Sequence, residues 1–281
     1  MGNKALQINP PNANINLSTH GSDWLWAVFS IMAVSLLVAI VANFLRPWGT
    51  RLFHQIAIII LTTASISYFA MASDLGATPV RVEFRKHGDS PTRQVWFVRY
   101  IQWFITFPLV VLELLLTTGL PLSDVFTAIF MSIVVVVSGL VGSLVPSTYK
   151  WGFYVFGVVA LFYIWYVLLL HGPRASFAAD LRAGYFMCAG WLSFITLLYP
   201  ISWALSEGGN VIKPTSEMIF YGILDLLAGP LFLCVFLFSL RSVDYAAFSL
   251  QSGKYSGTGG EAGAGPVRQT KAAEAGAAAQ A

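Results

Sequence analysis

Seven long apolar segments are the feature that most constrains how this chain can fold. Each is long enough to cross the hydrocarbon core of a bilayer, which takes about 20 helical residues. A spanning helix satisfies its own backbone hydrogen bonds in lipid, where no water can do so. The sequence therefore predicts an all-α membrane protein, a seven-transmembrane helix bundle. The predicted spans are residues 24–45, 52–73, 95–116, 122–145, 151–170, 183–205 and 218–240.

The composition supports a membrane protein over a soluble one. Only 10% of the residues are charged and 57% are hydrophobic, whereas a soluble domain has about a quarter charged residues. The net charge of +3 is small, and the charged residues are dispersed along the chain. We therefore expect no nucleic-acid partner, and we expect membrane lipids to surround the bundle.

The polar ends of the chain define the predicted domain limits. Residues 1–23 form a polar arm without the apolar core of a cleavable signal peptide. Residues 24–241 form the membrane domain, and the Gly- and Ala-rich residues 242–281 are predicted to be a disordered tail. Lysine and arginine are nearly balanced between the two sides. The glycosylation triplet that begins at Asn16 fits an external N-terminus, so we expect the arm outside and the tail in the cytoplasm.

Three ionisable residues stand out inside the predicted spans, where charges are costly and usually have a partner. Arg99 and Asp225 lie at comparable depth from the same side, so we expect them to form an ion pair. The sequence leaves open whether this pair is structural or has a proton or ligand role. Glu113 lies about 21 Å further along its helix from Arg99. It is interpreted either as a neutral, hydrogen-bonded glutamic acid or as a proton donor or acceptor.

Carboxylates and aromatic residues near the other spans suggest further features. Glu207 and Glu217 lie at the outer ends of the sixth and seventh spans, where we expect solvated surface carboxylates. Trp103, Tyr199 and Trp203 lie in mid-span, where they line an internal pocket or form plain core.

Proline is expected to deform three of the spans, because its ring cannot take part in regular helical hydrogen bonding. Pro108 and Pro200 fall in mid-helix and predict kinks. Pro230 predicts a bend in the seventh span, directly after Gly229.

Four motifs, in the correct order and spacing, resemble those of the microbial (type 1) rhodopsins. The resemblance covers about residues 24–241 and implies a seven-helix bundle in which retinal is bound to a lysine of the seventh helix. The motifs are RYIQWFITFPL at 99–109, SGLVG at 138–142, YP with a tryptophan three residues later at 199–203, and LD at 224–225.

The departures from the family pattern fall at the chromophore. Gly229 occupies the position of the retinal lysine, and Gln102 occupies that of the primary counterion. Thr196 stands where the sixth helix usually supplies a second tryptophan. All six lysines lie outside the apolar segments, so we expect no covalently bound retinal and no other cofactor.

The retained positions preserve a pocket and a set of polar groups. The resemblance implies a pocket formed by Trp103, Thr106, Thr196, Tyr199 and Trp203. It also places Glu113 at the proton-donor position and Glu217 at the proton-release position, as residues of a proton relay. Loss of the lysine removes one positive charge from the interior, and Gln102 in place of an acid removes one negative charge. We therefore expect the positive charge of Arg99 to balance the negative charge of Asp225.

This combination resembles the fungal opsin-related branch, which includes the 30 kDa heat-shock protein of the yeast plasma membrane. The resemblance implies a non-photochemical, stress-linked and chaperone-like accessory or regulator of plasma-membrane proteins such as the P-type proton ATPase. It also allows a homo-oligomer. No nucleotide, metal or nucleophile motif is present, so we do not expect an enzyme.

Two alternatives use the interior directly. One is a passive transporter or channel for protons, ions or weak acids through Arg99, Asp225 and Glu113. The other is a sensor that binds a lipid or a retinoid without a covalent bond.

Overall fold

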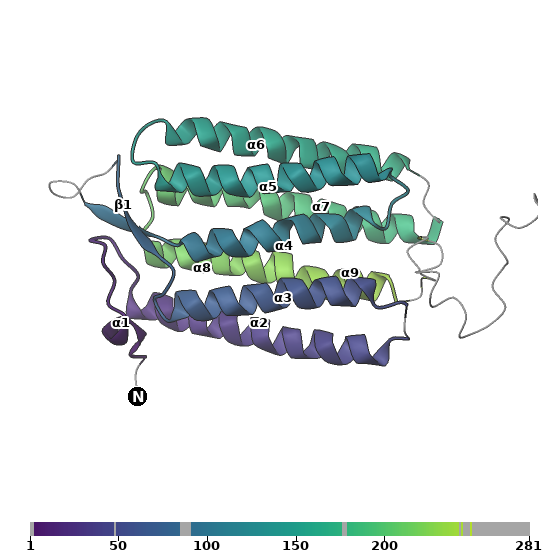
Figure 1. Ribbon diagram of the computed structural model, residues 1–281, viewed down its shortest axis with the longest axis horizontal. Coiled ribbons are helices and arrows are strands. Elements are labelled where there is room, and N and C mark those ends of the chain that lie inside the picture. Colours follow the sequence, from purple (N-terminus) through teal and green to yellow (C-terminus); the bar gives the residue numbers. More distant parts are fainter. Residues whose placement is uncertain are drawn as a thin grey trace, which may run out of the picture.

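The computed structural model describes residues 3–47, 49–84, 91–175 and 179–241, together with residues 243 and 248. Within this part of the chain, seven helices are long and apolar enough to cross a membrane, which confirms the predicted fold class. The helices lie side by side in one bundle (Figure 1). Apart from residues 243 and 248, the predicted tail at residues 242–281 lies outside the described residues.

Four spans are uninterrupted α-helices, and three contain π-helical turns. The uninterrupted ones are α2 (Thr19–Leu45), α3 (Leu52–Ala72), α4 (Phe97–Leu115) and α5 (Leu122–Leu144). The fifth span joins α6 (Lys150–Tyr166) to η1 (Val167–His171) and η2 (Gly172–Arg174), and the sixth joins α7 (Ala179–Trp203) to η3 (Ala204–Gly208). The seventh joins α8 (Pro214–Leu226), η4 (Leu227–Leu231) and α9 (Phe232–Ser239).

Successive helices pack beside one another, and the first closes against the last. Helix α2 contacts α3, α3 contacts α4, α4 contacts α5, and α5 contacts α6. Helix α2 also contacts α8, which closes the bundle around a common interior. This order follows the chain, because consecutive elements usually lie adjacent in space.

Helix α4 shows how the sequence directs polar groups inward. Its buried residues recur every three or four positions and include Arg99, Gln102, Thr106, Val110 and Glu113. This spacing places them on one side of a helix with 3.6 residues per turn. The opposite side carries exposed apolar residues, as expected for a surface that faces lipid.

The seventh span contains a π-helical turn, Leu227–Leu231, at Pro230, where the sequence predicted a bend. Proline has no N–H to donate, so it removes one hydrogen bond from the helical ladder. The Trp191 indole donates to the Leu227 carbonyl in this turn at 3.1 Å. In contrast, α4 and α7 remain α-helical through Pro108 and Pro200.

One end of the bundle is closed by elements that the sequence did not predict. Strands β1 (Thr78–Arg81) and β2 (Thr92–Val95) form an antiparallel hairpin. The N-terminal arm contains the short helix α1 (Ala5–Ile8) and lies at the same end as the hairpin (Figure 1). The arm bridges to β2 through Ile15 and Arg93.

The arm also joins the first and seventh spans. The Leu17 amide donates to Gln94 Oε1 at 2.9 Å, and the Ser18 amide donates to Thr215 Oγ1 at 3.1 Å. The Ser18 side chain caps α2 by accepting from the Gly21 amide. The first span therefore begins at Thr19, five residues before the predicted boundary.

Asp74 lies outside the spans, and its ionisation depends on how tightly this end of the bundle is packed. It is buried and has a left-handed φ of 59°, and its Oδ1 accepts from Gln94 Nε2 at 2.7 Å. Burial raises the pKa of Asp74, while the Gln94 hydrogen bond opposes this shift. Because the pKa is higher in the folded chain, the contribution of Asp74 to stability is present at acid pH and is lost as the pH rises through the folded value.

We therefore expect Asp74→Asn to stabilise the protein at neutral pH by about 0.5–1 kcal/mol. Asparagine keeps an acceptor for Gln94 and tolerates the left-handed backbone. Thermal unfolding of both proteins across pH measures the effect, and the difference should shrink under acid conditions. A variant that is less stable than the wild type at neutral pH would contradict this assignment.

Candidate functional site

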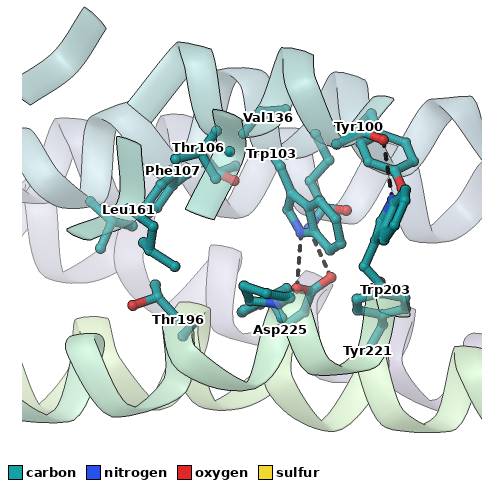
Figure 2. Close-up of a pocket in the computed structure, with 18 of the residues that line it drawn as sticks. Tyr100, Trp103, Thr106, Phe107, Val136, Leu161, Thr196, Trp203, Tyr221 and Asp225 are labelled. Atoms are coloured by element: carbon teal, nitrogen blue, oxygen red, sulfur yellow. Dashed lines mark hydrogen bonds between the residues drawn. The ribbon is translucent and has the colours of Figure 1, made fainter. Parts of the chain in front are cut away.

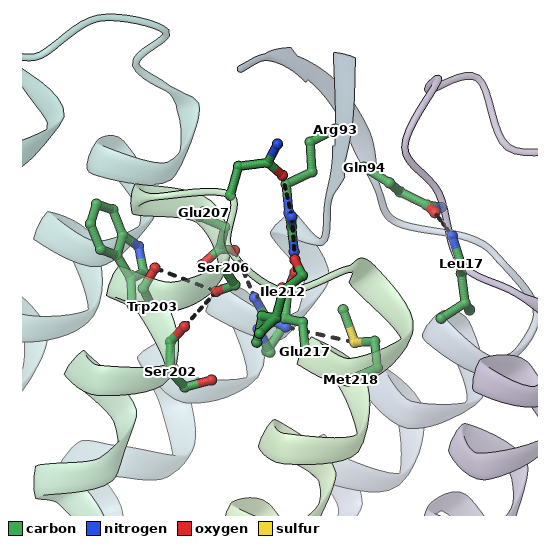
Figure 3. Close-up of polar contacts among 12 residues, drawn as sticks. Leu17, Arg93, Gln94, Ser202, Trp203, Ser206, Glu207, Ile212, Glu217 and Met218 are labelled. Atoms are coloured by element: carbon green, nitrogen blue, oxygen red, sulfur yellow. Dashed lines mark hydrogen bonds and ion pairs between the residues drawn. The ribbon is translucent and has the colours of Figure 1, made fainter. Parts of the chain in front are cut away.

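A cluster of four buried charges lies at the end of the bundle that carries the hairpin (Figure 3). Arg93 comes from β2, Arg99 from α4, Glu207 from η3 and Glu217 from α8, and each side chain is at most 2% exposed. Arg93 Nη2 lies 2.6 Å from Glu217 Oε2. Arg99 Nη2 lies 2.7 Å from Glu207 Oε1 and 2.9 Å from Glu217 Oε1. Each carboxylate therefore has a cationic partner, as buried charges require.

Neutral groups complete the coordination of this charge cluster. Arg93 Nη1 donates to Asn210 Oδ1 at 2.6 Å and to the Ile212 carbonyl at 2.7 Å. The Tyr100 hydroxyl donates to Glu207 Oε2 at 2.9 Å. Arg93 thus holds the loop between the sixth and seventh spans against the hairpin.

The predicted ion pair between Arg99 and Asp225 is wrong. Arg99 pairs with Glu207 and Glu217 instead, and these two carboxylates are buried, not solvated as expected. The cause is the cover at this end: the hairpin brings Arg93 over Glu217 and excludes solvent. Arg93 lies outside the predicted spans, and nothing in the sequence indicates that it would be buried.

Asp225 is held by four uncharged donors. Its Oδ1 accepts from Trp103 Nε1 at 3.0 Å and from the Tyr199 hydroxyl at 2.5 Å. Its Oδ2 accepts from the Tyr68 hydroxyl at 2.6 Å and from Gln102 Nε2 at 3.2 Å. All four groups donate, which fits a carboxylate that only accepts. Tyr68 is a partner that the sequence analysis missed.

The structure changes the predicted charge balance of the interior. Arg93 and Arg99 supply two positive charges, and Glu207, Glu217 and Asp225 carry three negative charges when ionised. The formal sum of these five groups is therefore −1, in place of the neutral pair that was expected. The difference arises because two glutamates and one arginine are buried rather than solvated.

A central cavity of about 140 Å³ lies beside Asp225. Phe107, Leu161 and Thr196 lie toward one end, and Trp103, Trp203 and Asp225 lie toward the other (Figure 2). The structure brings all the predicted pocket residues to its wall: Trp103, Thr106, Thr196, Tyr199 and Trp203. Gln102 and Gly229 also line it.

The residue at the position that the resemblance assigns to the retinal lysine is Gly229, on the wall of this cavity. No lysine is among its described lining residues. A Cβ atom built on Gly229 would meet nothing closer than Met32 Cε at 3.9 Å, so the position is open but carries no amine. Of the lysines that the structure describes, Lys150 lies at the hairpin end, where its Nζ is 3.7 Å from Glu83.

Glu113 lies apart from both the charge cluster and the cavity wall. Its side chain is fully buried, and neither carboxyl oxygen has a hydrogen-bond partner among the described residues. The described residues of the protein therefore do not supply the hydrogen bond that was expected for a neutral glutamic acid at this position. Its neighbours in sequence, Val111 and Leu114, are also buried and offer no polar side chain.

We expect Glu113→Leu to stabilise the protein by about 1–3 kcal/mol, because a buried polar group without a partner costs about that much. Thermal unfolding of the purified protein measures the change. Glu113→Gln is the matched control, since it keeps a polar group at the site and should give little gain. A destabilised Glu113→Leu variant would show that the carboxyl has a stabilising partner.

The helices and their buried polar groups define the class of protein. Seven membrane-length helices surround a central cavity, with an arginine–carboxylate cluster at one end and an aspartate bound by tyrosine and tryptophan in the middle. This is the architecture of an opsin-type membrane protein.

The chain belongs to the bacteriorhodopsin-like family, whose model, described as "Bacteriorhodopsin-like protein", matches residues 19–242. It is 69% identical over 258 residues to Protein FDD123 of Trametes versicolor, covering 91% of this chain and 90% of that protein. It is 37% identical over 262 residues to the 30 kDa heat shock protein of Saccharomyces cerevisiae, covering 85% and 78%. These relatives confirm the predicted relationship to fungal opsin-related proteins.

A solved structure shows the same fold. The light-driven proton pump LR (Mac) from Leptosphaeria maculans superposes with a TM-score of 0.77 at 30% identity. The match covers 82% of this chain and 98% of the pump.

Proposed function

We propose that this protein is a non-photochemical accessory protein of the fungal plasma membrane, linked to stress, that restrains or protects other membrane proteins such as the P-type proton ATPase. The observation that carries the proposal is Gly229. It stands on the cavity wall at the position that the family resemblance assigns to the retinal lysine. Without an amine there, the chain has no means to attach the chromophore that would drive a light reaction.

The family relationships support a stress role. One relative carries the name 30 kDa heat shock protein, and the opsin-related branch is linked to restraint of the plasma-membrane proton ATPase. A partner role needs no reactive group in the interior, which agrees with a chain that has lost two of the groups used in pumping.

The orientation that we propose places the N-terminus outside and the tail in the cytoplasm. The hairpin, the arm and the charge cluster then lie at the external face of the membrane. A protease added to intact cells should reach the hairpin side, and an epitope at the C-terminus should be protected.

The proposal is tested by proton-ATPase activity in plasma membranes from heat-stressed cells with and without this chain, at matched amounts of the ATPase. Higher activity without the chain is expected. The Gly229→Ala variant should restrain the ATPase as the wild type does, because the role does not use the chromophore position. Equal activity with and without the chain would overturn the proposed restraint.

A second candidate is passive conduction of protons, ions or weak acids. The observation that favours it is Glu113, which is buried without a hydrogen-bond partner on the helix that also carries Gln102 and Arg99. About 16 Å along that helix separates Gln102 from Glu113, more than one hydrogen-bonded step. Flux measurements in vesicles test it: Glu113→Gln and Asp225→Asn should each reduce the flux if this path conducts, and an impermeable wild type would exclude it.

A further inference from the structure

The central cavity contains a buried hydrogen-bond acceptor without a donor. Gln102 lines the cavity and is only 3% exposed, and its Oε1 has no hydrogen-bond partner among the described residues. The hydrogen bond to Asp225 determines the orientation of the Gln102 amide. Asp225 Oδ2 is an acceptor, so the Nε2 donor of Gln102 must face it, at 3.2 Å. The oxygen therefore remains free to accept from a bound molecule, and leaving it unpaired costs free energy.

The same region carries a formal charge of −1 when its carboxylates are ionised. Asp225 is the only carboxylate among the described residues that line the cavity, and no lysine, arginine or histidine is among them. The guanidinium of Arg99 is already engaged by Glu207 and Glu217. A donor that also carries a positive charge would satisfy Gln102 and offset the formal charge of −1.

The shape and lining of the cavity define the rest of the ligand. Aromatic side chains gather at the end that holds Asp225, including Trp103, Trp203 and Tyr221 (Figure 2). Aromatic rings attract cations within about 6 Å. The Arg99 guanidinium already lies 3.9 Å from the Tyr221 ring centroid and 5.3 Å from that of Trp103, so Trp203 is the ring of these three that a bound cation would use. The other end is apolar and contains Phe107 and Leu161. The volume of about 140 Å³ is close to the roughly 150 Å³ of an engineered cavity that holds benzene.

From these observations we infer that the cavity binds, without a covalent bond, a small primary amine that carries a ring-sized apolar group. The ammonium group donates to Gln102 Oε1 beside Asp225 and the aromatic rings, and the apolar group extends toward Phe107 and Leu161. An acid would place a second anion beside Asp225. A neutral alcohol would satisfy Gln102 but would leave the excess charge. This inference does not rest on the proposed stress role.

Benzylamine and benzyl alcohol provide a matched pair of probes, because they differ in charge but hardly in size. Titrations would use the full-length protein in nanodiscs and follow tryptophan fluorescence, since Trp103 and Trp203 line the cavity. We expect benzylamine to bind at least about tenfold more tightly than benzyl alcohol, the order expected for a charge-assisted hydrogen bond. Equal affinities, or no binding of benzylamine, would overturn the inference.

Three variants separate binding in the cavity from partition into lipid. Asp225→Asn should reduce benzylamine affinity to that of benzyl alcohol while the alcohol still binds, which shows that the cavity is intact. Gln102→Leu should weaken both probes, and serves as the second test if Asp225→Asn does not fold. Gly229→Phe should abolish both by filling the cavity. Benzylamine binding that persists unchanged in Gly229→Phe would place the amine elsewhere and overturn the inference.

Discussion

Arg99→Gln is expected to destabilise the protein by about 3–5 kcal/mol, the usual cost of removing one partner from a buried ion pair. The Arg99 side chain is 0% exposed and contacts two carboxylates that are themselves fully buried. Without it, Arg93 is left to offset both Glu207 and Glu217, although it contacts only Glu217 directly. Thermal unfolding of the purified protein in nanodiscs measures the loss.

Two further variants identify the cause of that loss. Arg99→Gln combined with Glu207→Gln should recover most of the stability, because it removes one charge of each sign. Arg81→Gln removes an exposed arginine of the hairpin and should change stability by no more than about 0.5 kcal/mol. If the double variant is as unstable as Arg99→Gln alone, packing of the guanidinium rather than charge would be responsible.

The second large effect is expected at the cavity. The Gly229→Lys, Gln102→Asp variant should gain a visible absorption band when incubated with retinal, whereas the wild type should gain none. A side chain at position 229 enters open space, because the nearest atom to its Cβ is Met32 Cε at 3.9 Å. The introduced amine then lies on the same cavity wall as Asp225 and the introduced aspartate. Absorption spectra of the purified proteins measure the gain.

The matched control for this experiment is Gly229→Met with Gln102→Asp, which has a long side chain but no amine. It should remain colourless with retinal. A lysine variant that folds but never gains the band would show that the pocket cannot admit the chromophore, against the arrangement described above.

The spans were predictable because crossing a bilayer takes about 20 mostly apolar residues, and the sequence contains seven such runs. Pro230 marked the position of the π-helical turn in the seventh span. The hairpin at Thr78–Arg81 and Thr92–Val95 was missed because its strands are only four residues long, and the second does not alternate between buried and exposed positions. The order of the N-terminal arm was also missed, since polar residues such as Asn9 and Asn14 are held by contacts distant in sequence.

The residues of the site were predictable only where their positions on a helix determine which way they face. The motifs placed Trp103, Thr196 and Tyr199 around one cavity, and the structure brings them there. The charge cluster depends instead on a cover built from the hairpin, so the partners of Arg99 could not be read from its own helix. Burial of a charged residue can be predicted from its place in an apolar segment. Its ion-pair partner cannot, because that depends on how distant segments pack.

The contacts of the arm have a consequence for biogenesis. Ser18 bonds to Thr215 at the start of the seventh span, and Arg93 of the hairpin pairs with Glu217 two residues beyond. These partners are synthesised last, so the arm and hairpin cannot complete their contacts until the final helix has entered the bilayer. A chain that stalls before residue 214 keeps the contact of Leu17 with Gln94 but lacks that of Ser18 with Thr215. A gain in resistance of the arm to proteolysis on addition of the seventh span therefore reports that insertion of the whole bundle is complete.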